Sequence, residues 1–181
     1  MKSYILFFIL FFVSVGIVRS QESDSRKGFT ISAEYRYLTG KVYHCFSDKN
    51  FNWNSSTYEK NISIYAGYFF NPNLNINMGI GFDDNKYGLP LFLQSKYYFK
   101  EKKNSFYAAG EIAYRLIDKP WYYRGYDLSA FLGKELSISK RLAFNFHAGY
   151  NFHKAMFDIK SRDIKKHNYH NLLLGIAFSY K

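Results

Sequence analysis

The chain has little cysteine, little proline and no long apolar run beyond its N-terminus. Cys45 is the single cysteine among 181 residues, so an internal disulfide framework is excluded. The apolar run Tyr4–Val18 is shorter than the roughly 20 residues that a membrane-spanning helix needs. No helical stripe of apolar residues follows it. Stability must therefore come from burial, from lipid or from a closed hydrogen-bonded sheet.

The first 20 residues have the composition of an export signal. Lys2 supplies a positive charge ahead of the apolar run, and Val18 and Ser20 place small or modest residues at positions −3 and −1 of a cleavage site. We expect cleavage after Ser20, which removes 1–20 as a signal peptide.

Removal of the signal leaves a short periplasmic segment, 21–27, and one domain, 28–181. The remaining chain has 23 basic and 14 acidic residues, a net charge of +9. A charge of this sign often indicates nucleic acid, but an exported chain does not meet it. The expected anionic partner is the outer-membrane lipid, including lipopolysaccharide.

Eight stretches of about ten residues alternate apolar and polar side chains from Gly28 to the C-terminus. In the cleanest stretch, 74–83, leucine, isoleucine, methionine and phenylalanine fall on one face, and asparagine, glycine and aspartate fall on the other. Phe131 and Leu173 are exceptions, because they fall on the polar face. The alternation predicts eight strands, at 29–37, 62–70, 74–83, 89–99, 106–115, 126–133, 142–152 and 171–180.

The connections between these stretches alternate in length. The short ones are 71–73, 100–104 and 137–140; the others, mostly longer, are 38–60, 84–88, 116–125 and 153–168. Short turns at one rim and longer loops at the other are typical of outer-membrane barrels, and place both termini at the periplasmic rim. An even strand count lets the sheet close, which a bilayer requires because unpaired backbone groups are costly there.

Two features favour apolar side chains outside the barrel rather than inside, as in a secreted lipocalin-like carrier of small ligands. Aromatic residues occupy the apolar face near both strand ends, as expected at two membrane–water interfaces. The polar face has charges of both signs, which can neutralise one another in a narrow lumen. The predicted lumen network comprises Glu34, Arg36, Lys96, Glu111, Arg115 and Asp127. The predicted fold is therefore an all-β, closed, antiparallel, eight-stranded transmembrane barrel.

The segment Leu89–Phe99, LPLFLQSKYYF, resembles the fourth strand of small OmpA/OmpX-like, porin-related outer-membrane barrels found in Bacteroidetes. The closing segment Gly175–Tyr180 resembles a barrel-terminal strand, although Lys181 follows where an aromatic residue is usual. The resemblance covers essentially the whole mature chain. It implies the bacterial outer membrane, recognition by the barrel-assembly machinery, and roles that range from structural proteins to adhesins.

The predicted outer loops are the main candidate for a functional surface. They are aromatic and basic, a composition that suits glycans, proteins or the phosphate of lipopolysaccharide. The residues expected to form this extracellular surface are Trp53, Trp121, Tyr122, Tyr123, Lys160, Arg162, Lys165 and Lys166. We therefore expect a structural or surface-interaction role without enzymatic activity, cofactor or metal.

The sequence leaves three other functions open. A narrow channel would need an open path through the inward charges, which a salt-bridged plug would close. A lipid-A-modifying enzyme would need a serine activated by a histidine, for which His147 and Ser129 are the available pair. A zinc site would have to join His44 and Cys45 to histidines 153, 167 and 170, whose spacing is not compact.

Overall fold

The structure is a computed structural model, and it describes residues 26–45, 53–84, 89–101, 104–116, 124–158 and 164–181. The expected signal peptide lies outside these residues, as does most of the segment 21–27. No helix in the described part of the chain has the length and apolar character needed to cross a membrane.

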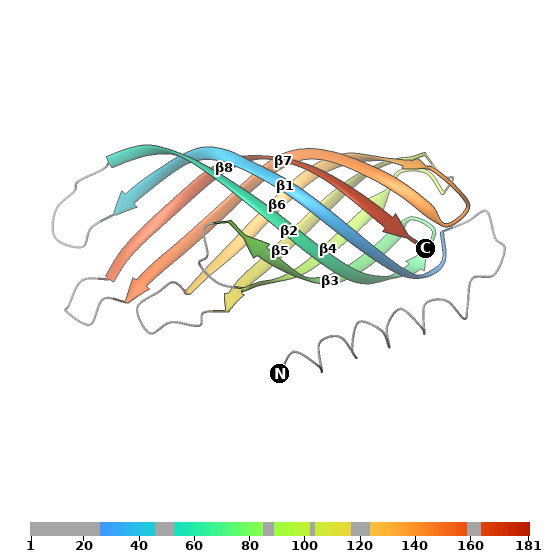
Figure 1. The fold of residues 1–181 in the computed structure, drawn as a ribbon, viewed down its shortest axis with the longest axis horizontal. Helices are drawn as coiled ribbons and strands as arrows, with labels where there is room; N and C mark the ends of the chain where they lie inside the picture. Colours follow the sequence, from blue (N-terminus) through green and yellow to red (C-terminus); the bar gives the residue numbers. More distant parts are fainter. Residues whose placement is uncertain (1–25, 46–52, 85–88, 102–103, 117–123, 159–163) are drawn as a thin grey trace.

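Eight antiparallel strands form one closed sheet (Figure 1). Each strand pairs with the next along the chain, and β8 pairs with β1, so the strand order is the sequence order. The strands are β1 Gly28–Cys45, β2 Trp53–Asn71, β3 Leu74–Asp83, β4 Leu89–Tyr98, β5 Phe106–Leu116, β6 Arg124–Ser137, β7 Leu142–Asp158 and β8 Ile164–Tyr180.

The pairing register makes the strands tilt around the barrel. The register can be followed around the barrel by starting at Ala33 on β1 and moving each time to the paired residue on the next strand. The path returns to β1 at Tyr43 after passing through Ile64, Ile80, Leu91, Tyr114, Tyr126, Lys154 and Asn168. One circuit therefore advances ten residues along β1, from 33 to 43, toward the outer rim. An offset of this kind belongs to strands tilted by about 35–45° from the barrel axis.

The two faces of the sheet have the predicted polarity. Apolar side chains point outward, with exposed fractions of 70% at Met78 and 57% at Ile62. Tyr65 and Gln94 point inward and are 0% exposed. The two exceptions to the alternation, Phe131 and Leu173, also lie inside, where they pack in the core. The reversed, lipocalin-like arrangement is therefore wrong.

The strands are longer than predicted at the outer rim. Most of the expected loop 38–60 belongs to β1 and β2, which pair as far as His44 and Trp53. Much of the expected loop 153–168 likewise belongs to β7 and β8. The strands continue because beyond the apolar band both faces can be polar, so the alternation fades while the pairing does not.

The wall of the barrel consequently has unequal height. Four strands, β7, β8, β1 and β2, have 17 to 19 residues each, whereas β3, β4 and β5 have 10 or 11. The last β2–β3 pair at the outer end joins Asn61 to Asp83, so β2 continues for eight residues, 53–60, beyond it. Figure 1 shows these four strands extending furthest on the side away from the C-terminus.

Inward-facing glycines make room for inward-facing aromatic rings. A Cβ added at Gly133 would touch the ring of Tyr107, and one added at Gly79 would lie 2.5 Å from Cδ1 of Tyr65. The His147 ring similarly lies against Gly175. The rings can therefore lie across the lumen, close to the backbone of neighbouring strands. The aromatic and polar side chains together fill the interior.

Candidate functional site

The lumen contains three groups of buried charges, one central, one near the outer rim and one at the inner rim. All six residues of the predicted network are buried. Five further charged residues, which are not part of the predicted network, contribute to these groups: Arg26, Glu59, Asp83, Glu135 and Lys181.

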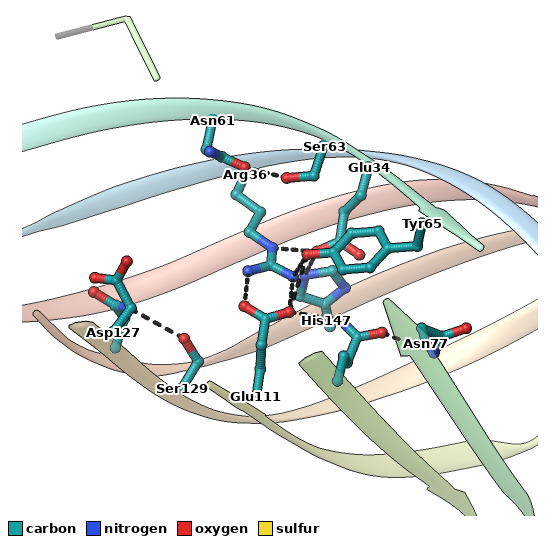
Figure 2. A network of polar contacts seen from close by, with 12 residues as sticks. Glu34, Arg36, Asn61, Ser63, Tyr65, Asn77, Glu111, Asp127, Ser129 and His147 are labelled. Atoms are coloured by element: carbon teal, nitrogen blue, oxygen red, sulfur yellow. Dashed lines mark hydrogen bonds and ion pairs between the residues drawn. The ribbon is translucent and has the colours of Figure 1, made fainter. Parts of the chain in front are cut away.

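The central group is built around Arg36 of β1 (Figure 2). Its guanidinium contacts both Glu34 and Glu111, with Nη2 lying 2.7 Å from Oε2 of Glu111. The Tyr65 hydroxyl lies 2.6 Å from Nη2 and donates to the same Glu111 oxygen at 3.0 Å. Gln94 donates to that oxygen at 2.9 Å. The group thus joins β1 to β5 across the lumen.

Two other side chains complete the central group. His147 Nε2 lies 3.2 Å from the Glu34 carboxylate, and its ring packs on Phe131 with 4.6 Å between centroids. Lys96 is 3% exposed, and its Nζ lies 5.4 Å from the centroid of the Tyr107 ring. With two carboxylates, the Arg36 guanidinium and the Lys96 amine, the central group has no net charge when Lys96 is protonated and His147 is neutral.

The outer group places three carboxylates around Arg115. Its Nη2 lies 2.9 Å from Glu59, its Nε lies 3.2 Å from Asp127, and its Nη1 contacts Asp83. His153 contacts the second oxygen of Asp127. The carboxylates come from β2, β3 and β6, so Arg115 on β5 links strands on different sides of the lumen.

The inner group brings the two ends of the barrel domain together. Glu135 lies 3.1 Å from Arg26 Nε and 2.6 Å from Lys181 Nζ. Arg26 also donates to the carbonyl of Lys100 at 2.7 Å and lies over the Tyr98 ring, 4.1 Å from its centroid. Arg26, two residues before β1, and Lys181, the residue after β8, therefore meet at the inner rim of the barrel through one carboxylate.

The predicted network is thus brought together as two groups rather than one. Glu34, Arg36, Lys96 and Glu111 lie in the central group, while Arg115 and Asp127 lie in the outer one. Glu59 was missed because it falls in a segment expected to be a loop. Glu135 was missed because β6 continues past the predicted end at residue 133. Glu135 does fall at an inward position of the alternation, so a predicted strand that continued past residue 133 would have included it.

The predicted extracellular surface falls where side chains are not described. Trp53 is the first residue of β2, and Lys165 and Lys166 lie in β8 rather than in a loop. Trp121, Tyr122, Tyr123, Lys160 and Arg162 lie outside the described residues. Their part in binding remains a prediction.

The serine and histidine of the enzymatic alternative are not brought together. Ser129 is paired across strands with Asn151 and accepts a hydrogen bond of 3.0 Å from its amide. His147 is paired with Gly133 and contacts Glu34 and Tyr107 instead. The described arrangement therefore offers no serine–histidine dyad at this pair.

The histidines of the zinc alternative are divided between two faces. His153 is 6% exposed and points into the lumen, while His170 is exposed on the outside, where Tyr150 binds it. His44 pairs with His167 in the backbone register, but the side chains of His44 and Cys45 are not described. Among the residues that are described, no group of three or more potential metal ligands forms.

Comparison with known proteins reveals the fold but no sequence relative. No family and no curated protein matches the sequence. The outer membrane protein OprG from Pseudomonas aeruginosa has a similar structure, with a TM-score of 0.54 and 12% identity over 89% of this chain and 99% of that one. Neisserial surface protein A is also similar, with a TM-score of 0.53 and 15% identity over 83% and 96% of the two chains. The fold is thus that of small outer-membrane β-barrels.

Proposed function

We propose that this chain is an exported, integral outer-membrane barrel with a sealed lumen, which serves a structural or surface-interaction role through its outer rim and is not an enzyme. The observation that supports membrane insertion best is the outward-facing apolar surface. Large apolar side chains on all eight strands face outward and are exposed, as they would be against lipid.

Aromatic residues lie at both ends of this apolar band. Phe29, Phe70 and Phe106 are more than half exposed near the inner rim, and Phe82 and Tyr114 are 63% and 49% exposed near the outer rim. Aromatic side chains favour the headgroup level of a bilayer. These two belts support a membrane-inserted barrel over a water-soluble one, because so much exposed apolar surface would favour aggregation in water.

The expected partners follow from this placement. An exported barrel requires the barrel-assembly machinery and contacts outer-membrane lipid, and its outer rim faces extracellular glycans or proteins. The tall wall formed by β7, β8, β1 and β2 would extend furthest from the membrane surface. A surface-interaction role would use the outer ends of these four strands first.

The first test compares boiled and unboiled samples of the outer-membrane fraction by gel electrophoresis in detergent. We expect the protein to be enriched in that fraction and to run at a different mobility before boiling, because a closed barrel resists unfolding by detergent. A soluble periplasmic protein of unchanged mobility would contradict the proposal.

Planar-bilayer recording tests whether the lumen is sealed. Arg36 and Arg115 each bridge strands across the interior, and rings such as Tyr65 and Tyr107 fill the space beside them. We therefore expect no conductance steps above the lipid background, in preparations whose insertion is verified by the unboiled gel band. A large porin inserted under the same conditions provides the positive control, and discrete steps from this protein would show a channel.

A further inference from the structure

The outward-facing charged side chains that the structure describes have one sign. Where the structure describes outward-facing side chains on the strands, every charged residue is a lysine: Lys41, Lys60, Lys134 and Lys154. Three of them, all except Lys134, lie toward the outer rim. Lipid-facing positions near the outer leaflet are thus basic, although the lumen has many carboxylates.

Two of these lysines flank a histidine that is held in place by aromatic rings. Lys41 pairs directly with His170 across β1 and β8, and Lys154 lies two residues beyond Phe152, the β7 partner of His170. The imidazole lies 5.2 Å from the ring of Phe152 and 5.4 Å from that of Tyr43. We call Lys41, Lys154 and His170 the basic patch.

One nitrogen of His170 is occupied by a hydrogen bond, which leaves the second nitrogen available. The Tyr150 hydroxyl contacts Nδ1 of the imidazole. When that hydroxyl donates to Nδ1, the imidazole proton resides on Nε2, which becomes a hydrogen-bond donor. Lys154 Nζ lies 5.9 Å from the centroid of the Tyr126 ring, on the neighbouring strand β6. A donor on the same outward surface as two lysines suits a phosphate.

An apolar groove begins at the same tyrosine. A line of small side chains crosses the strands from Ser95 to Gly110 to Ala130 and ends at Tyr150, each residue paired with the next. A Cβ added at Gly110 would have no neighbour within 4 Å, so the surface is hollow there. The groove has a volume of about 740 Å³.

The walls and direction of the groove suit an acyl chain. A parallel row of larger side chains borders the small ones: Leu93, Ile112, Leu128 and Phe152. Because the register advances toward the outer rim with strand number, the line of small residues climbs from β4 to β7 and reaches its highest point beside the basic patch. A chain in the groove would thus run from the headgroup level toward the middle of the bilayer.

We propose that this surface binds one phosphorylated lipid of the outer leaflet, with an acyl chain in the groove and a phosphate against the basic patch. The inference rests on the proposed membrane insertion and adds a specific lipid site to it. Charge complementarity identifies the headgroup as anionic, and the hollow of small residues distinguishes the site from the general attraction of a basic protein to lipid.

Native mass spectrometry of the folded, detergent-purified protein tests the proposal with diphosphoryl lipid A and its fully dephosphorylated form as probes. We expect the wild type to bind the phosphorylated form roughly tenfold more tightly, as expected for two lysines beside an anionic headgroup. The triple variant K41Q/K154Q/H170Q should lose this preference. The matched control, Lys134→Gln, removes a lysine at the inner rim and should keep it.

A second pair of variants tests the groove. Gly110→Leu combined with Ala130→Leu fills the hollow and should weaken binding of both lipids by a similar factor while the preference for phosphate remains. Ala66→Leu adds the same side chain at an outward position of β2 and should bind like the wild type.

Two results would overturn the site. One is equal binding of the two lipids by the wild type, and the other is equal loss in Lys134→Gln and the triple variant. The unboiled gel band and insertion into vesicles are checked first for each variant. A wild type that fails to insert would refute the proposed function, whereas an inserted barrel without the preference would refute the lipid site alone.

Discussion

An Arg36→Met variant is expected to lose about 3–5 kcal/mol of unfolding free energy, because removal of one partner leaves buried charges uncompensated. Arg36 contacts Glu34 and Glu111, whose side chains are 0% and 1% exposed. Methionine retains much of the side-chain length but supplies no donor. Equilibrium unfolding in urea, followed by tryptophan fluorescence of the protein in detergent micelles, measures the loss.

A matched change outside the lumen separates this effect from the loss of a cation in general. Lys134→Met removes a lysine from the outward face of β6, and we expect a change within about 0.5 kcal/mol. Adding Glu111→Gln to Arg36→Met should cost less than the sum of the two single changes, because the two residues act as a pair. Equal stabilities of the Arg36→Met and Lys134→Met variants would show that the central group does not stabilise the barrel.

A Gly133→Val variant is expected to lose about 3 kcal/mol, toward the upper end of the cost of overpacking. An added Cβ would lie 2.8 Å from the carbonyl oxygen of Phe146 and would overlap the Tyr107 ring. Tyr107 is 0% exposed and packs against Tyr98, so its ring has little room to move. The same urea titration gives the change in free energy.

Gly110→Val is the control for this substitution. Gly110 lies on the neighbouring strand but faces outward, and an added Cβ would meet nothing within 4 Å. Because β-branched residues favour strands, the change should leave stability equal or slightly higher. A similar loss of stability in both variants would mean that valine destabilises the strand itself. It would contradict the expectation that the loss at Gly133 comes from overlap with the Tyr107 ring.

The sequence predicted the direction of the side chains better than their partners. Alternation with a period of two distinguishes the faces, and it placed Arg36 and Glu111 in the lumen. It could not pair them, because these residues lie on β1 and β5 and meet only through the ten-residue offset of the closed barrel. That offset is set by the pairing of all eight strands together.

Strand ends were predicted less well than strand centres. The pattern is legible only where one face meets lipid and the other does not. Glu59 and Val42 lie beyond the apolar band, where outward positions such as Ser56 and Lys41 are polar, so their segments were assigned to loops. Glu135, at the inner rim, was missed for the same reason, because the outward-facing Lys134 interrupts the series of apolar residues. The apolar groove could not be predicted from the sequence either, because its small residues lie on three strands and form a line only when the strands are paired in the folded register.

If the barrel lies in the outer membrane as proposed, the unequal height of its strands determines which strand ends a large particle approaching the cell meets first. The eight residues of β2 beyond its last pair with β3 span about 26 Å along the strand, at about 3.3 Å per residue. The strand is tilted, so its end stands about 20 Å higher than the end of β3. In the proposed outer-membrane setting, a layer of surface sugars thinner than this would cover the outer ends of β3, β4 and β5 and leave the ends of the four long strands within reach of an antibody, a phage or a host cell.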